Sequence, residues 1–366
     1  MKQRITMASL LLAATMGLNA QKPMNAPKGG KAISDELIGI FFEDISSSAD
    51  GGLNAELIQN GSFEFSPAEH DGWGPGTAWK QIRPGHSLGT LIVKQQAPIH
   101  PNNPNYMQLV ERTKQYKDFT GWRGFGLQND GFDGINVKAG KKYDFSTFLR
   151  NVNGGEKEVR IALVQPQGYG KDPKLLAEST IKVSNNAWQK YACTLTPAED
   201  CANAALQILV LTNGVMDIDM VSLMPQDTYH GHGLRKDLAE ALEALNPRFM
   251  RFPGGCVVHG GGDGFWNTYR WKETVGSKET RRQQKNTWGY HQSMALGYYE
   301  YFQMCEDMGM QPVPILPCGV SCQGANGGWS MWPEQAQDVK PMSEMDEWTQ
   351  DALDLIEWAN GDVTTK

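Results

Sequence analysis

The segment Arg251-Phe-Pro-Gly-Gly-Cys256 constrains the fold of this chain more than any other stretch. Before it, residues 234–245 place apolar side chains at helical spacing, and Asn246-Pro247 ends that helix because proline cannot continue it. Residues 248–252 then indicate a short buried strand. A helix, a strand and a glycine turn in this order are typical of a (β/α)8 barrel, which carries its functional residues after the carboxyl ends of its strands. Any open α/β sheet contains a similar unit, so this segment alone leaves both folds open.

The first twenty residues are organised like an export signal. Met1-Lys-Gln-Arg4 is basic, residues 5–18 form an apolar run, and Ala20 is a small residue before a cleavage site at Gln21. The run is too short to span a bilayer, so a membrane anchor is the weaker interpretation. We expect residues 1–20 to be a signal peptide, the protein to be exported to the periplasm or beyond, and no membrane partner.

The composition excludes several kinds of partner. The 366-residue length suggests two domains, and the net charge of −7 argues against nucleic acid or an anionic membrane as the main partner. The 40 glycines and 19 prolines fit a protein rich in loops and strands better than a helical bundle. The sequence has no Cys-x-x-Cys and its seven histidines lack ligand spacing, so we expect no metal and no cofactor.

The six cysteines can form disulfides in an exported chain. Cys193 and Cys201 flank a short polar turn and could pair across a hairpin. Cys318 and Cys322 are four residues apart and either pair or stay free. The spacing does not decide between these arrangements.

Hydrophobic periodicity divides the rest of the chain into three stretches. Residues 33–59 contain an apolar run at 37–42, expected as a first strand, and a turn that leads into a short helix. Residues 60–225 contain short runs of β-forming residues between turn signals, which predict an antiparallel β-sandwich. The expected strands there include Leu91–Lys94, Tyr143–Arg150, Glu158–Gln165, Trp188–Leu195, Ala205–Leu211 and Asp217–Met224.

From residue 230 to 366 the pattern changes to alternating helices and strands. After the units already described, the spacing predicts a helix over 290–308, a strand over 312–317 and a helix over 343–360. Alternation of this kind is typical of a parallel sheet with helices outside it. About three βα units can be counted, whereas a closed barrel needs eight. The expected fold is therefore α/β plus β: an incomplete (β/α)8 TIM barrel with an inserted antiparallel β-sandwich.

Seven segments, in order along the chain, carry a resemblance to a known family: Gly39–Asp44, Gly51–Asn60, Arg251–Cys256, Tyr269–Gly276, Asn286–Tyr290, Leu296–Tyr301 and Asp351–Gly361. With them the chain resembles the N-terminal portion of an α-L-arabinofuranosidase of glycoside hydrolase family 51. The form it resembles carries a carbohydrate-binding-like sandwich near its N-terminus. The resemblance extends from about residue 33 to residue 366.

The resemblance implies a secreted retaining glycosidase. Such an enzyme removes terminal α-L-arabinofuranosyl residues from plant polysaccharides such as arabinoxylan and arabinan, and the full-length protein is expected as a homo-oligomer. Retaining enzymes use two carboxyl groups about 5–5.5 Å apart, one as acid/base and one as nucleophile. In the family the acid/base lies in a Gly-Asn-Glu motif after the fourth barrel strand, and the nucleophile lies near the seventh.

This sequence contains no Gly-Asn-Glu. We therefore expect both catalytic glutamates beyond Lys366, assign neither role to a residue of this chain, and expect the 366-residue chain alone to be inactive. The alternative is a non-catalytic carbohydrate-binding protein or an inactive truncated product, folded mainly through its sandwich.

Six residues are candidates for substrate binding: Glu43, Cys256, His259, Trp271, Asn286 and Trp288. Glu43 resembles the family carboxylate that hydrogen-bonds arabinose hydroxyls, and a carboxylate offers about four lone-pair sites for such bonds. The alternative for Glu43 is a solvated carboxylate at a strand end. We expect its neighbour Asp44 to be structural.

The other candidates have equally plain alternatives. Cys256 resembles the family cysteine beside the arabinose, or is a buried thiol that only packs. Trp271 and Trp288, the latter close to Asn286, either stack on a sugar or fill space. His259 either bonds a sugar hydroxyl or caps its loop. The expected sandwich could bind polysaccharide through aromatic residues such as Trp73, Trp79, Trp122 and Tyr169. Alternatively, it could serve only to pack against the barrel.

Overall fold

The structure is a computed structural model that describes residues 32–113, 121–168, 171–260, 265–322 and 337–362. Its contacts separate Met1–Leu37 from one compact unit, Ile38–Lys366, which contains all of the sheets described below. The expected signal peptide, residues 1–20, lies outside the described residues, as does Tyr169.

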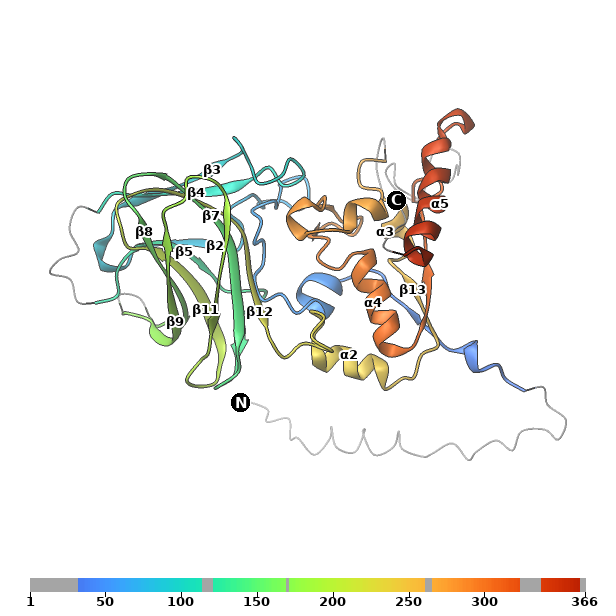
Figure 1. The fold of residues 1–366 in the computed structure, drawn as a ribbon, viewed down its shortest axis with the longest axis horizontal. Helices are drawn as coiled ribbons and strands as arrows, with labels where there is room; N and C mark the ends of the chain where they lie inside the picture. Colours follow the sequence, from blue (N-terminus) through green and yellow to red (C-terminus); the bar gives the residue numbers. More distant parts are fainter. Residues whose placement is uncertain (1–31, 114–120, 169–170, 261–264, 323–336, 363–366) are drawn as a thin grey trace, which may run out of the picture. The chain divides into compact units, whose positions relative to one another are not determined.

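Antiparallel strands between residues 79 and 225 form two sheets (Figure 1). One has five strands in the order β10-β7-β12-β4-β3. The other has six strands, in the order β2-β5-β11-β8-β9 with β6 beside β11. These strands are β2 (Trp79–Ile82), β3 (Gly89–Lys94), β4 (Tyr106–Glu111), β5 (Phe125–Asn129), β6 (Ile135–Val137), β7 (Tyr143–Asn153), β8 (Lys157–Gln165), β9 (Lys174–Val183), β10 (Gln189–Leu195), β11 (Cys201–Val210) and β12 (Gly214–Pro225).

The two antiparallel sheets share one hydrophobic core. Burial alternates along β7, where Phe145, Thr147 and Leu149 are fully buried and Ser146 and Phe148 between them are partly exposed. Ile161 of β8 and Ile208 of β11, from the other sheet, belong to the same buried cluster. Each sheet therefore buries one face against the other, which is why alternation in the sequence identified these strands.

A further sheet, separate from these two, is parallel. β1 (Ile40–Phe41), β13 (Phe249–Phe252) and β16 (Gln311–Pro314) form a three-stranded sheet in the order β1-β13-β16. Three helices accompany it: α2 (Lys236–Glu243), α4 (Tyr298–Met308) and α5 (Asp346–Asn360). Side chains from β13 and from all three helices form a core of their own. The expected strand–helix alternation is confirmed for these elements.

Two expected helices are shorter than the sequence pattern suggested. The helix expected over 290–308 begins only at Tyr298, and the residues before it include the short strand β15 (His291–Gln292), which pairs with β14 (Gln284–Lys285). Gly297 directly precedes this helix. A Cβ atom on residue 297 would lie only 1.9 Å from the Thr274 carbonyl oxygen, so the close approach of the two segments requires glycine here. The helix expected after residue 50 is one irregular turn, Ala49–Leu53, which Gly51 interrupts with a φ of 81°.

The disulfide considered between Cys193 and Cys201 is wrong. None of the six cysteines, each among the described residues, forms a disulfide. Cys193 belongs to β10 in the five-stranded sheet, whereas Cys201 begins β11 in the six-stranded sheet. The turn between them therefore crosses from one sheet to the other and does not close a hairpin. Cys318 and Cys322 are not joined by a disulfide either.

Phe145 and Phe148 allow a matched test of this core, because they lie on opposite faces of β7. Phe145→Ala should lower the free energy of unfolding by about 3–5 kcal/mol, the usual loss for a buried phenylalanine. Phe148→Ala, at a half-buried position, should cost only about 1 kcal/mol. Urea unfolding of both variants checks this, and equal losses would contradict the assignment of the two faces.

Candidate functional site

The candidate site lies at the carboxyl ends of the parallel strands. Glu43 follows β1, and Gly254 to Cys256 follow β13. Parallel neighbours end at the same edge of a sheet, so these residues meet there. The Phe42 amide donates to the Arg251 carbonyl oxygen at 2.9 Å, which continues the pairing of the two strands up to the site.

Glu43 is held in place by backbone groups. The Val257 amide, in the short helix α3 (Cys256–His259), donates to Glu43 Oε1 at 2.9 Å. A Cβ at Gly254 would lie 2.6 Å from Glu43 Cγ, so only glycine lets the carboxylate lie against this turn. Oε2 accepts no hydrogen bond from the described residues. Nearby, the Arg251 guanidinium stacks on the Phe41 ring at 4.4 Å.

The β14–β15 hairpin docks beside Glu43 through the backbone of Asp44. Asn286 and Tyr290 close the hairpin, with the Asn286 amide donating to the Tyr290 carbonyl oxygen at 2.6 Å. Asn286 Nδ2 and the Tyr290 hydroxyl both donate to the Asp44 carbonyl oxygen, at 2.9 and 2.6 Å. At the hairpin tip Trp288 is 47% exposed, and its amide donates to Asn286 Oδ1 at 2.6 Å.

The Asp44 carboxyl group is buried behind Glu43. Its Oδ1 accepts from the Ala49 amide at 3.1 Å and from the Tyr290 hydroxyl at 3.1 Å, and its Oδ2 accepts from Gln292 Nε2 at 3.3 Å. Burial, with a further contribution from the charge of Asp50, raises the pKa of Asp44 to about 6. The side chain is only 2% exposed, which agrees with the expected structural role.

Four of the six sequence candidates surround the strand ends. Glu43 and Cys256 are half-buried beside the glycine turn, Asn286 is fully buried, and Trp288 projects from the hairpin. Asn286 acts on the backbone of Asp44 and positions the loop, since its side chain is not exposed to a ligand. The substrate-binding roles of Glu43, Cys256 and Trp288 stay predictions.

The other two candidates have contacts that favour their alternatives. Trp271 is 4% exposed, donates from Nε1 to the Asp351 carbonyl oxygen at 2.9 Å, and packs against Trp358 at 5.5 Å. His259 Nδ1 lies 2.9 Å from the Val320 carbonyl oxygen, a bond that ties its loop to the segment after β16. These placements suit packing for the tryptophan and loop capping for the histidine.

Sequence reasoning missed Tyr290 and Gln292, which hold the hairpin against Asp44. Both were placed on a helix, because the apolar spacing of α4 was extended too far toward the N-terminus. Asn286-Thr-Trp-Gly-Tyr290 carries a turn signal in Gly289, whose φ is 89°, and this signal marks the hairpin.

The site has the chemistry of hydrogen bonding to a polar neutral ligand. Among the described residues no cluster of histidine, cysteine or carboxylate side chains could hold a metal ion. Within the same ranges no helix is both long and apolar enough to cross a bilayer. None of the six candidates lines the cavity of about 470 Å³ described below, although Tyr290 lines it.

The raised pKa of Asp44 predicts a pH-dependent stability. The folded chain holds this proton more tightly than the unfolded chain, so stability is lost as pH rises from about 4 to about 6, by about 3 kcal/mol in total. Asp44→Asn should remove this part of the dependence. Its amide can be accommodated if the Gln292 amide rotates, since Gln292 Oε1 has no partner among the described residues.

Urea unfolding between pH 4 and pH 7 measures the difference between the wild-type chain and Asp44→Asn. Subtracting the two curves cancels the other buried carboxyls, such as Glu64, whose pKa burial raises to about 7. A difference that does not change with pH would contradict the prediction.

Comparison with known proteins identifies relatives of this chain. Residues 241–366 match the family model described as the α-L-arabinofuranosidase 1 domain. An extracellular exo-α-L-arabinofuranosidase of Streptomyces chartreusis is 38% identical over 349 residues, covering 92% of this chain and 38% of the relative. α-L-Arabinofuranosidase 1 of Arabidopsis thaliana is 32% identical over 342 residues, covering 92% of this chain and 46% of the relative.

A solved structure gives the same result for the fold. An arabinose-bound α-L-arabinofuranosidase of family 51 superposes with a TM-score of 0.74 at 28% sequence identity, covering 90% of this chain and 49% of that one. The chain thus spans about two-fifths to one half of the length of these proteins. The resemblance stated from sequence motifs is confirmed, and the chain is a relative of the α-L-arabinofuranosidases of glycoside hydrolase family 51.

Proposed function

We propose that these residues belong to an exported, retaining α-L-arabinofuranosidase that removes terminal α-L-arabinofuranosyl groups from polysaccharides such as arabinoxylan and arabinan. The observation that carries the proposal is the Glu43 carboxylate, fixed by the Val257 amide with one oxygen directed away from that bond. A sugar hydroxyl can donate to such an oxygen at no further cost in side-chain ordering. The names of the relatives support this choice of sugar.

The architecture follows the same proposal. β1, β13 and β16 would be the first strands of a (β/α)8 barrel, with residues 33–59 and 230–366 in its incomplete form. Residues 60–225 would be the inserted carbohydrate-binding-like β-sandwich, in which the two antiparallel sheets share a core. The parallel order of the three strands and the separate cores support this division. Residues 1–20 would direct export.

The site residues have distinct proposed roles. Glu43 accepts hydrogen bonds from arabinose hydroxyls, and Cys256 lines the pocket beside it. Trp288 offers an exposed indole on which a sugar face can pack. Asn286 positions the hairpin that carries Trp288, through its bond to the Asp44 carbonyl oxygen.

The catalytic pair is not assigned to any residue of this chain. Near the strand ends, Glu43 is bonded to a backbone amide and Asp44 is buried among hydrogen-bond donors. We propose that the acid/base and the nucleophile come from the part of the full-length relatives that this chain does not match. The chain on its own would then bind arabinose without hydrolysing its glycosides.

Binding of methyl α-L-arabinofuranoside to the 366-residue chain tests the role of Glu43. Glu43→Gln should weaken binding about 10- to 100-fold, since hydrogen bonds to a charged group contribute about 1.5–3 kcal/mol. Gly254→Ala should act in the same direction by displacing the carboxylate. Glu306→Gln, an exposed position on α4, is the matched control.

Isothermal titration calorimetry measures these affinities, and p-nitrophenyl α-L-arabinofuranoside reports hydrolysis by the same samples. Unchanged affinity in Glu43→Gln would remove Glu43 from the site. Turnover by the wild-type chain above the background of a mock purification would place the catalytic pair within these residues.

A further inference from the structure

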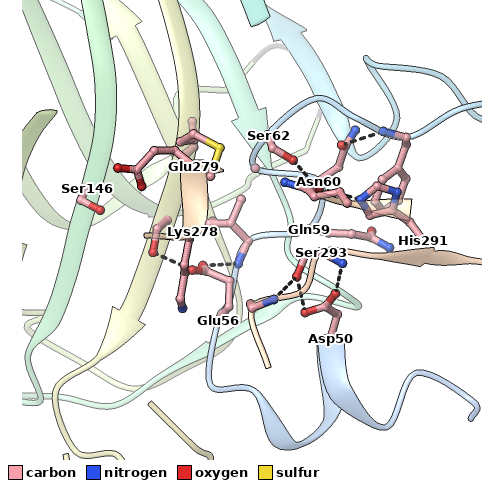
Figure 2. Close-up of a pocket in the computed structure, with 18 of the residues that line it drawn as sticks. Asp50, Glu56, Gln59, Asn60, Ser62, Ser146, Lys278, Glu279, His291 and Ser293 are labelled. Carbon is pink, nitrogen blue, oxygen red and sulfur yellow. Dashed lines mark hydrogen bonds between the residues drawn. The ribbon is translucent and has the colours of Figure 1, made fainter. Parts of the chain in front are cut away.

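A cavity of about 470 Å³ lies apart from the Glu43 site (Figure 2). Its wall includes Ser146 and Phe148 of β7, Met220 of β12, and the loop around Lys278. Its volume lies within the roughly 300–1,000 Å³ range of small-molecule sites and equals the share of roughly fifteen water molecules. The space is therefore large enough for a short oligosaccharide.

One part of the wall is aromatic. Trp73 stacks on Phe65 with ring centroids 4.6 Å apart and planes 20° apart, and Phe65 in turn contacts the His291 ring at 4.8 Å. Phe132, which is 37% exposed, and Phe148 complete the apolar surface. Rigid aromatic surfaces of this kind pack against the C–H faces of sugar rings and exclude water from them.

Another part of the wall presents hydrogen-bonding groups without protein partners. The Gln59 side-chain amide, Gln283 Nε2 and the Ser146 hydroxyl have no hydrogen-bond partner among the described residues, and all three residues line the cavity. Figure 2 shows Gln59 and Ser146 at the cavity. Amides and hydroxyls that converge on one space are the groups that orient a polar ligand in a mostly apolar pocket.

Two carboxylates of the wall accept hydrogen bonds from neighbouring neutral groups. Asp50 accepts from the Ser293 hydroxyl at 2.8 Å and from the Ser293 amide at 2.9 Å. Glu56 accepts from the Leu223 amide at 2.8 Å and the Ser222 hydroxyl at 2.6 Å. The other charged side chains of the wall are Lys190, Lys278 and Glu279, so the wall carries three carboxylates and two ammonium groups. The two signs differ by one charge, which favours a neutral ligand over a phosphate or a cation.

We propose that this cavity is a second saccharide-binding site, which takes a short neutral oligosaccharide of pentose units. The choice of pentoses rests on the proposed function; the choice of a neutral polyhydroxylated ligand rests on the wall itself. Tyr290 lines the cavity and donates to the Asp44 carbonyl oxygen, one residue from Glu43. The two sites therefore share a wall, and the chain can hold a polysaccharide at one position while an arabinose occupies the other.

Calorimetric titration of the 366-residue chain with α-1,5-linked arabinotriose, and separately with xylotriose, tests the proposal. Ser146→Trp fills the cavity from β7 and should weaken one binding event at least tenfold. Gln59→Leu keeps the volume, removes the amide, and should weaken the same event about two- to tenfold. Thr90→Trp, at an exposed position on β3 of the same sheet, is the matched control and should bind as the wild type does.

Glu43→Gln separates this inference from the proposed function. If saccharide binding persists in Glu43→Gln and is lost in Ser146→Trp, the second site is supported. If Ser146→Trp and Gln59→Leu both bind as the wild type does, or if the wild-type chain binds neither trisaccharide in addition to its Glu43 site, the cavity holds only water and the inference is overturned. Circular dichroism checks that Ser146→Trp is folded, and Gln59→Leu decides the question if it is not.

Discussion

Two hydrogen bonds to the backbone oxygen of Asp44 hold the functional part of this molecule together. Asn286 Nδ2 and the Tyr290 hydroxyl donate them, from a hairpin more than 240 residues away in the sequence. They fix the position of the hairpin beside the end of β1, and hence the position of Trp288 relative to Glu43. A backbone carbonyl can accept two such bonds without a compensating charge, so the contact survives burial. The positions of the hairpin, the candidate site and the wall of the neighbouring cavity all depend on these two hydrogen bonds.

The segment from Glu56 to Glu69 makes a comparable connection between distant parts of the chain. Glu56 binds the backbone of β12 through Leu223, Ser62 donates to Gln283 at 2.8 Å, and Glu69 lies 2.8 Å from His291 Nδ1. His291 Nε2 in turn lies 2.7 Å from Gln283 Oε1, so the imidazole is held from both sides. Side chains of one short segment thus reach both the antiparallel sheet that contains β12 and the β14–β15 hairpin. Several of the residues that make these polar contacts, such as Glu56, Ser62 and His291, also line the cavity.

Part of the fold could be predicted from the sequence, because strands such as β7 bury alternate residues and this pattern is visible in the chain itself. The residues at which helices and strands begin and end were harder to predict. The start of α4 at Tyr298 depends on the close approach of Gly297 to Thr274, a contact that no local pattern records. The Cys193–Cys201 pairing failed for a similar reason, because a turn that changes sheets resembles a hairpin turn. Glu43 is a candidate because of the motif around it, whereas the contacts of Tyr290 and the cavity arise between segments far apart in sequence.

The position of the Tyr290 hydroxyl makes its hydrogen bonding depend on pH. This hydroxyl contacts both the carbonyl oxygen and Oδ1 of Asp44, a carboxyl group that changes its charge near pH 6. A protonated Asp44 leaves the hydroxyl bonded mainly to the backbone, whereas an ionised one competes for the same hydrogen. Because Tyr290 lies between Asp44 and the cavity, one proton alters the wall that the two proposed sites share. Mildly acidic and neutral surroundings therefore give this wall two different hydrogen-bonding patterns.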